Sequence, residues 1–124
     1  MVKTILVVDD DPDLIYTIRM GFENIDKNYK ILGAESGKKC LELLKNNEIP
    51  DLILLDIMMP EMNGWDVAAE IKKNPKWSGI PIVFLTAQSD AFSRTFGGIV
   101  SADYITKPFE IMELKESIDR LLGR

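Results

Sequence analysis

The chain contains no histidine, and this absence excludes several kinds of site at once. A Ser-His-Asp or Cys-His arrangement needs an imidazole as its general base, so neither form of nucleophilic catalysis is available to this chain. Metal sites built on histidine are excluded for the same reason. Any bound metal would be held mainly by carboxylate and carbonyl oxygens, which favours hard cations such as Mg²⁺, Ca²⁺ or Mn²⁺.

Cysteine and long apolar runs are scarce as well. Cys40 is the single cysteine, so the chain cannot form an internal disulfide, which suits a reducing compartment. The longest uncharged stretch, residues 77–89, contains Pro81 and is too short to span a bilayer. The apolar residues 5–8 lead directly into three aspartates and do not resemble a signal peptide. We therefore expect a cytoplasmic protein that does not bind a membrane.

Positive charge is in the minority. Lysine and arginine number 15 against 20 aspartates and glutamates, which gives a net charge of −5. Because nucleic-acid binding needs a basic face that contacts phosphates, we expect no direct binding of nucleic acid. The length of 124 residues, with 46% hydrophobic and 28% charged residues, predicts one globular domain over residues 1–124.

Short apolar segments alternate with segments of helical periodicity. Strands are expected at residues 4–8, 29–33, 51–55, 80–85 and 103–106. Several of them lack polar alternation, which is typical of strands that are covered on both faces. A helix follows each strand, and the first helix is expected to bury a stripe formed by Leu14, Ile18, Phe22 and Ile25.

Local signals mark where the helices begin and end. The expected N-caps are Asp11, Ser36, Asn63 and Ser89. Pro12 suits a first helical position, and Gly123 suits the left-handed residue after the last helix. The helix from Ser89 to about Gly98 has the weakest pattern, because two adjacent glycines end it early.

Five strand–helix units in succession predict an α/β fold. Parallel strands joined by right-handed helical crossovers form an open, doubly wound sheet. The expected arrangement is flavodoxin-like (βα)5, a five-stranded parallel sheet in the order 2-1-3-4-5 with helices on both faces. Ligands of such sheets bind at the carboxyl ends of the strands, next to strands 1 and 3.

Charged or hydroxyl side chains follow four of the five expected strands. They are Asp9 and Asp10, Asp56, Thr86, and Lys107. Taken singly, each has an ordinary explanation as a helix cap, a strand end or a surface charge. Together they place three carboxylates and one ammonium at one edge of the sheet, a sum of −2. Carboxylates this close repel one another, and a hard divalent cation such as Mg²⁺ would offset the repulsion.

Four segments carry a resemblance to a known family. They read Ile-Leu-Val-Val-Asp-Asp at residues 5–10, Leu-Leu-Asp-Ile-Met-Met-Pro-Glu-Met-Asn-Gly at 54–64, Val-Phe-Leu-Thr-Ala at 83–87 and Tyr-Ile-Thr-Lys-Pro-Phe at 104–109. In this order and spacing they resemble the receiver (CheY-like) domain of two-component response regulators. The resemblance extends over essentially the whole chain.

The resemblance implies a phosphoacceptor protein. Asp56 would take a phosphoryl group from a phosphohistidine of a sensor histidine kinase or histidine phosphotransfer protein, since this chain has no histidine. Mg²⁺, with Mn²⁺ as an alternative, would be held by Asp9, Asp10, Asp56 and the backbone carbonyl of Met58. The chain would catalyse only its own phosphorylation and dephosphorylation and would otherwise not be an enzyme.

The resemblance also implies a switch. Thr86 and Lys107 would contact the phosphoryl oxygens, and Tyr104 would then turn inward. The face formed by the fourth helix, the fifth strand and the fifth helix would change and act on an unknown output. The Lys107–Pro108 bond would be cis. One departure from the family falls at Val100–Ser101, where the family usually has Gly-Ala. The segment from Thr86 to Lys107 is also about one residue shorter here than in the family.

Three other functions can be compared with these residues. A haloacid-dehalogenase-type phosphatase would need an aspartate two residues after Asp56, where this chain has Met58. A flavodoxin-like electron carrier would need a phosphate loop where this chain has three aspartates, which would repel the flavin phosphate. A degenerate receiver that acts as a phosphorylation-independent docking module is the remaining alternative.

Overall fold

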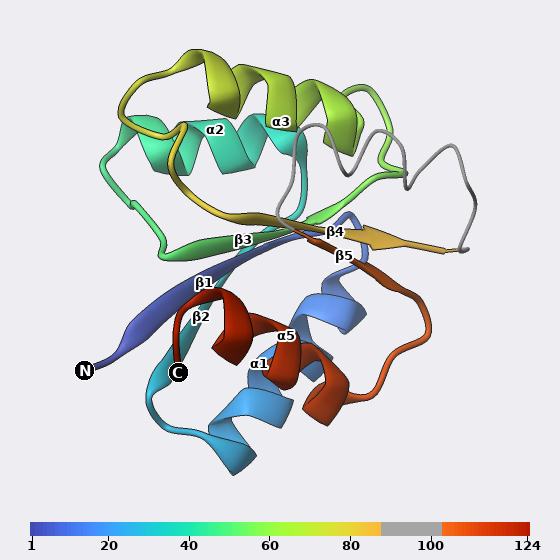
Figure 1. The fold of residues 1–124 in the computed structure, drawn as a ribbon. Helices are drawn as coiled ribbons and strands as arrows, with labels where there is room; N and C mark the ends of the chain where they lie inside the picture. Colours follow the sequence, from blue (N-terminus) through green and yellow to red (C-terminus); the bar gives the residue numbers. More distant parts are fainter. Residues whose placement is uncertain (88–102) are drawn as a thin grey trace.

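The computed structural model describes residues 1–87 and 103–124 of the chain (Figure 1). The helix expected from Ser89 to about Gly98, its N-cap and the departure at Val100–Ser101 lie outside the described residues. None of the described helices has the length and hydropathy that a membrane-spanning segment needs.

The strands form one parallel sheet in the order β2-β1-β3-β4-β5, as expected. Their bounds are β1 Lys3–Val8, β2 Tyr29–Ala34, β3 Leu52–Asp56, β4 Ile82–Thr86 and β5 Asp103–Thr106. The strand expected from residue 80 begins at Ile82, because the N–H of Ile80 donates to the carbonyl of Trp77 in a turn. Asp56 and Thr86 are the last residues of their strands, which brings both to the carboxyl edge.

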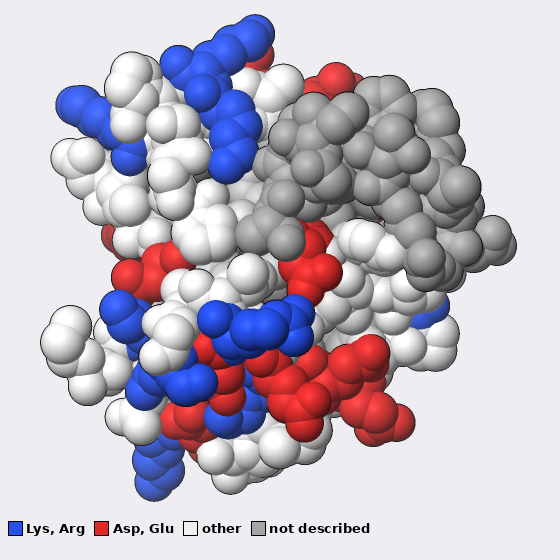
Figure 2. All heavy atoms as spheres, in the orientation of Figure 1, with Lys and Arg blue, Asp and Glu red and all other residues white. Residues whose placement is uncertain are grey.

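The described helices cover both faces of the sheet. They are α1 Pro12–Ile25, α2 Gly37–Lys45, α3 Gly64–Lys73 and α5 Ile111–Leu121. Figure 1 shows α2 and α3 on one face and α1 and α5 on the other. In the same orientation, lysine and arginine side chains gather over α2 and α3 at the upper left, whereas carboxylates gather beside α5 at the lower right (Figure 2).

The expected caps inside the described residues are confirmed. The side chain of Asp11 accepts from the N–H of Asp13, and Pro12 is the first residue of α1. The side chains of Ser36 and Asn63 accept from the third residues of their helices, and Asn63 belongs to a reciprocal capping box. Gly123 has a φ of 72°, the left-handed conformation expected after α5.

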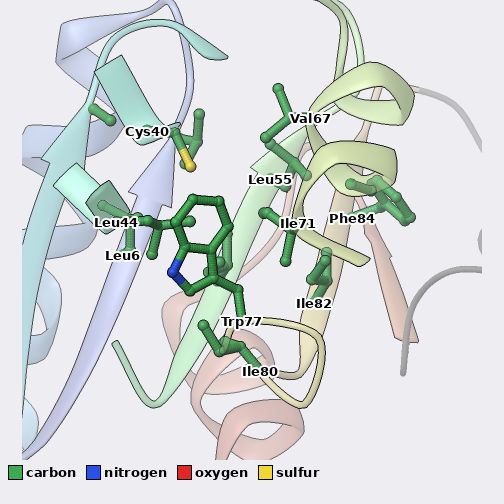
Figure 3. Close-up of a cluster of buried hydrophobic side chains, with 14 of the residues drawn as sticks. Leu6, Cys40, Leu44, Leu55, Val67, Ile71, Trp77, Ile80, Ile82 and Phe84 are labelled. Carbon is green, nitrogen blue, oxygen red and sulfur yellow. The ribbon is translucent and has the colours of Figure 1, made fainter. Parts of the chain in front are cut away.

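The core residues that the structure describes form two clusters, one on each face of the sheet. The cluster beneath α2 and α3 contains Cys40 and Trp77 (Figure 3). The turn after α3 places the Trp77 ring among core side chains and leaves the residue 8% exposed. On the other face, Ile15 replaces Leu14 in the buried stripe of α1, and Ile25 is exposed. The buried face of α1 is therefore rotated from the expected one.

Candidate functional site

Three of the predicted site residues share one side of the sheet. Asp9, Asp56 and Lys107 each lie two residues after a strand residue of the cluster that packs against α1 and α5. Because side chains alternate along a strand, this spacing directs all three toward the same face at the carboxyl edge. Asp10 joins them: one ligand oxygen from each of Asp9, Asp10 and Asp56 lies within 4.8 Å of the other two.

Lys107 bridges the two buried carboxylates. Its Nζ donates to Asp9 Oδ2 at 2.8 Å and to Asp56 Oδ1 at 3.4 Å. The other oxygen of Asp9 accepts from the N–H of Asp11 at 2.9 Å. Asp9 is 1% exposed and Asp56 is 4% exposed, whereas 26% of the Lys107 side chain is exposed. Of these three side chains, that of Lys107 is the most exposed to solvent.

Burial and mutual repulsion govern the charges. Burial, together with the negative charge of Asp9, raises the pKa of Asp56 to about 6, although the Lys107 ammonium and the N–H of Met58 act in the opposite direction. Burial alone would lower the pKa of Lys107, but its hydrogen bond to Asp9 and the charges of Asp56 and Asp9 outweigh burial and raise it. Keeping these carboxylates ionised therefore costs free energy unless a further cation binds beside them.

The donor set fits a hard divalent cation. The three clustered carboxylates offer only oxygen ligands, the type that Mg²⁺ and Mn²⁺ prefer. Mg²⁺ keeps several waters of its own, so a few protein oxygens are enough. The exposed position of Asp10 leaves an approach from solvent. The backbone carbonyl of Met58 stays a predicted ligand, on the loop directly after Asp56.

The loop after β3 is held against the start of α3 at Gly64. A Cβ at Gly64 would lie 2.5 Å from the carbonyl oxygen of Asp56 and 2.8 Å from Cα of Ile57, closer than real side chains come. The N–H of Gly64 also donates to the carbonyl of Ile57 at 2.9 Å. Only glycine permits this approach, which explains why the segment 54–64 ends in a glycine.

Thr86 and Tyr104 lie on the opposite side of the sheet from the carboxylates. Thr86 is 6% exposed, and its carbonyl accepts from the N–H of Lys107 at 2.6 Å. Tyr104 is partly buried against the cluster beneath α2 and α3 and is the register neighbour of Phe84. The Lys107–Pro108 bond is cis, as expected. The contacts of Thr86 and Lys107 with a phosphoryl group, and the inward turn of Tyr104, stay predictions.

A hollow of about 450 Å³ next to Lys107 was not foreseen from the sequence. It is lined by Asp11, Leu14, Thr17, Ala87, Lys107, Pro108, Phe109 and Ile111. Leu14 lines this hollow and is only partly buried against the core cluster on that face, which accounts for its absence from the buried stripe of α1. The apolar Phe109, directly after the Lys107–Pro108 pair, was the one available signal.

Comparison with known sequences agrees with this geometry. Residues 5–119 match the family model described as response regulator receiver domain. The chain is 44% identical to a protein of Vibrio cholerae named as a cyclic di-GMP phosphodiesterase and 37% identical to the response regulator SaeR of Staphylococcus aureus. These matches cover 93% and 97% of this chain. The chain spans only 25% and 50% of the length of these two relatives.

Solved structures give the same result. A response regulator from Chloroflexus aurantiacus matches with a TM-score of 0.90 and 29% identity, and the match covers 100% of both chains. The N-terminal domain of a response regulator receiver protein from Methanoculleus marisnigri matches with a TM-score of 0.77 and 38% identity, over 100% of this chain and 99% of that one.

Proposed function

Because the chain belongs to the response regulator receiver domain family, we propose that it is the phosphoacceptor switch of a two-component phosphorelay. A partner phosphohistidine, on a sensor histidine kinase or a histidine phosphotransfer protein, donates the phosphoryl group, and Asp56 accepts it. We place residues 1–124 in one domain that works in the cytoplasm. The activities of the longer relatives belong to those proteins, of which this chain covers half or less.

The observation that carries the proposal is the position of Asp56. Its carboxylate ends β3, is nearly buried, and lies within 4.8 Å of ligand oxygens of Asp9 and Asp10 and 3.4 Å from the Lys107 ammonium. A buried aspartate beside two further carboxylates and one ammonium is suited to accept a charged group. A docking module that is independent of phosphorylation would not need this set.

The proposed reaction transfers a phosphoryl group from an imidazole nitrogen of the partner to a carboxylate oxygen of Asp56. An oxygen of Asp56 forms a bond to phosphorus while the bond from phosphorus to the partner's imidazole nitrogen breaks, and the electron pair leaves with the imidazole. Asp9, Asp10, Asp56 and the Met58 carbonyl would hold Mg²⁺. When bound, the ion neutralises charge on the phosphoryl oxygens. The chain thereby catalyses only its own phosphorylation and, with water as acceptor, its own dephosphorylation.

Two side chains convert the new group into a change of shape. Lys107 exchanges one carboxylate partner for a phosphoryl oxygen, because its long, flexible side chain lets the ammonium move to the new group. Thr86 donates its hydroxyl to another phosphoryl oxygen, and Tyr104 turns inward on the adjacent strand. The changed surface includes β5 and α5 and is recognised by an output partner of unknown identity.

The test is labelling with a small phosphodonor. We expect acetyl phosphate and Mg²⁺ to add one phosphoryl group to the protein, detected by intact-mass spectrometry. Asp56→Asn should abolish the label, and EDTA should prevent it. Asp51→Asn is the matched control, since Asp51 is a partly buried aspartate just before the same strand and accepts a backbone hydrogen bond that asparagine can also accept. Equal labelling of Asp56→Asn and the parent would refute the proposal.

A further inference from the structure

Trp65 lies in the first turn of α3 and packs on the strand that carries Thr86. The ring centroids of Trp65 and Phe84 are 4.4 Å apart, with an angle of 57° between the rings. Phe84 is fully buried and precedes Thr86 by two residues on β4, so both side chains face the same side of the sheet. The indole therefore covers the residue next to Thr86 on that face.

Phe84 is also the neighbour of Tyr104. The two residues are register partners on the adjacent parallel strands β4 and β5. Tyr104 and Trp65 are both partly buried and pack against the same core cluster. Trp65, Phe84 and Tyr104 thus form a row that runs from α3 across β4 to β5, which we call the aromatic row.

The aromatic row is tied to the phosphoacceptor loop through the backbone. Gly64, the residue before Trp65, is in direct contact with the backbone of Asp56 and Ile57, and its N–H donates to the Ile57 carbonyl at 2.9 Å. Such a close contact between backbones leaves little room for independent movement. A shift of the loop after Asp56 must therefore also move the first turn of α3, and Trp65 with it.

We propose that Trp65 is a positioning residue of the switch, which limits the space into which Tyr104 turns and couples that turn to the loop after Asp56. This inference rests on the proposed function, in which Tyr104 has an outward and an inward orientation. In the unmodified protein the indole, by holding Phe84 in place, favours the outward orientation. Removing part of the indole gives Phe84 room to yield and raises the population of the inward orientation.

Linkage gives this proposal a second readout. A ligand that favours the inward orientation binds more tightly to a variant in which that orientation is more populated. As long as the inward orientation is rare, the apparent affinity for the ligand rises by the same factor as the inward population. Beryllofluoride with Mg²⁺ is such a ligand, because it takes the geometry of a phosphoryl group on a carboxylate. For Trp65→Leu we expect both the inward population and the apparent affinity to rise by about fivefold or more.

The experiment uses ¹⁹F NMR of protein labelled with 3-fluorotyrosine. The chain has three tyrosines, and Tyr104→Phe identifies the signal of Tyr104. The Tyr104 signal of each variant is followed during titration with beryllofluoride and Mg²⁺. Trp65→Phe keeps a smaller ring on Phe84 and should move both quantities in the same direction by about twofold. Trp77→Phe is the control, because Trp77 is buried in the same cluster but follows the other end of α3.

The outcomes separate this inference from the proposed function. Matched changes in the Tyr104 signal and the beryllofluoride affinity for the two Trp65 variants, with Trp77→Phe like the parent, support the inference. It is overturned if Trp65→Leu and Trp65→Phe keep the parent's values, or if Trp77→Phe changes them equally, while Asp56 is still labelled by acetyl phosphate. Loss of labelling in the parent itself would overturn the proposed function, and the inference with it.

Discussion

Lys107 donates a 2.8 Å hydrogen bond to Asp9, the least exposed carboxylate of the site. The same ammonium reaches the proposed phosphoacceptor, Asp56, only at 3.4 Å. Lys107 is thus primarily the counter-ion of Asp9, and it lies between two carboxylates that would otherwise repel each other. The stability and the reactivity of the site therefore depend on the same side chain.

Replacing Lys107 should destabilise the metal-free protein. Lys107→Met leaves Asp9 and Asp56 buried without their cation, and because the ammonium is partly solvated we expect a loss of about 1–3 kcal/mol in the free energy of unfolding. Urea denaturation in EDTA measures this loss, and saturating Mg²⁺ should recover much of it. Lys72→Met is the control, since the exposed Lys72 donates to the backbone carbonyl of Ser78. Equal stability of Lys107→Met and the parent in EDTA would contradict the assignment.

Removing Asp10 should have the opposite effect on the metal-free protein. Asp10→Asn takes away one of three clustered carboxylates and so relieves repulsion, but Asp10 is exposed, which limits the gain to about 1 kcal/mol. The same change should abolish the stabilisation by Mg²⁺. Denaturation with and without Mg²⁺ measures both effects, with the exposed Asp13→Asn as the control. A variant that is less stable in EDTA and still responds to Mg²⁺ would show that Asp10 is not a ligand.

The raised pKa of Asp56 predicts an unusual pH dependence. In the native state its pKa is about 6, against about 3.9 in the unfolded chain, so the native state binds more protons between these values. Stability of the metal-free protein should therefore fall, by about 2 kcal/mol, as the pH rises from about 4 to above 6. Asp56→Asn should remove this slope. Asp26 and Asp119 have lowered pKa values, so their contributions are lost only at more acidic pH.

Urea denaturation at several pH values in EDTA tests this expectation. Because protons and Mg²⁺ compete for Asp56, the stabilisation by Mg²⁺ should also weaken below about pH 6. Asp51→Asn should keep the slope of the parent. A flat profile for the parent, or the same slope in Asp56→Asn, would show that another group titrates in this range.

Residue order alone was enough to predict the fold and the convergence of the site. The strand order follows from five strand–helix units, and the placement of Asp9, Asp56 and Lys107 on one edge follows from that order. Which side chains bond to each other within the site does not follow from the residue order. The preference of Lys107 for Asp9 over Asp56 depends on distances of a few tenths of an ångström, which side-chain packing decides.

Burial of single side chains was harder to predict than the topology. Leu14 and Ile15 both fit a helical stripe, and the direction of α1 against the sheet decides between them. Trp77 lies in a turn, where periodicity carries no information, and the turn happens to direct its ring into the core. The contact of Gly64 with the Asp56 backbone explains why a glycine stands at this position, which the sequence motif by itself does not reveal.

The lifetime of the phosphorylated state is predicted to depend on Met58. Hydrolysis needs a water in line with the acyl phosphate, and an apolar thioether cannot orient one. The Met58 side chain is 74% exposed, directly beyond the N–H that faces Asp56, so it is free to line the path of that water. The second residue predicted to flank this path, Gln88, lies outside the described residues. Because only one of these two residues, Gln88, has a polar side chain that could orient the water, we expect slow hydrolysis, over many minutes.

Two substitutions test this view of the lifetime. Met58→Asn adds an amide that can hold the attacking water and should speed the loss of phosphate severalfold, whereas Gln88→Leu should slow it. Met112→Asn is the matched control, since Met112 is an exposed methionine on α5, outside the loop that follows Asp56. Loss of phosphate is followed by intact mass after the donor is removed. A parent lifetime of seconds, or equal rates for the parent and both variants, would show that these side chains do not control hydrolysis.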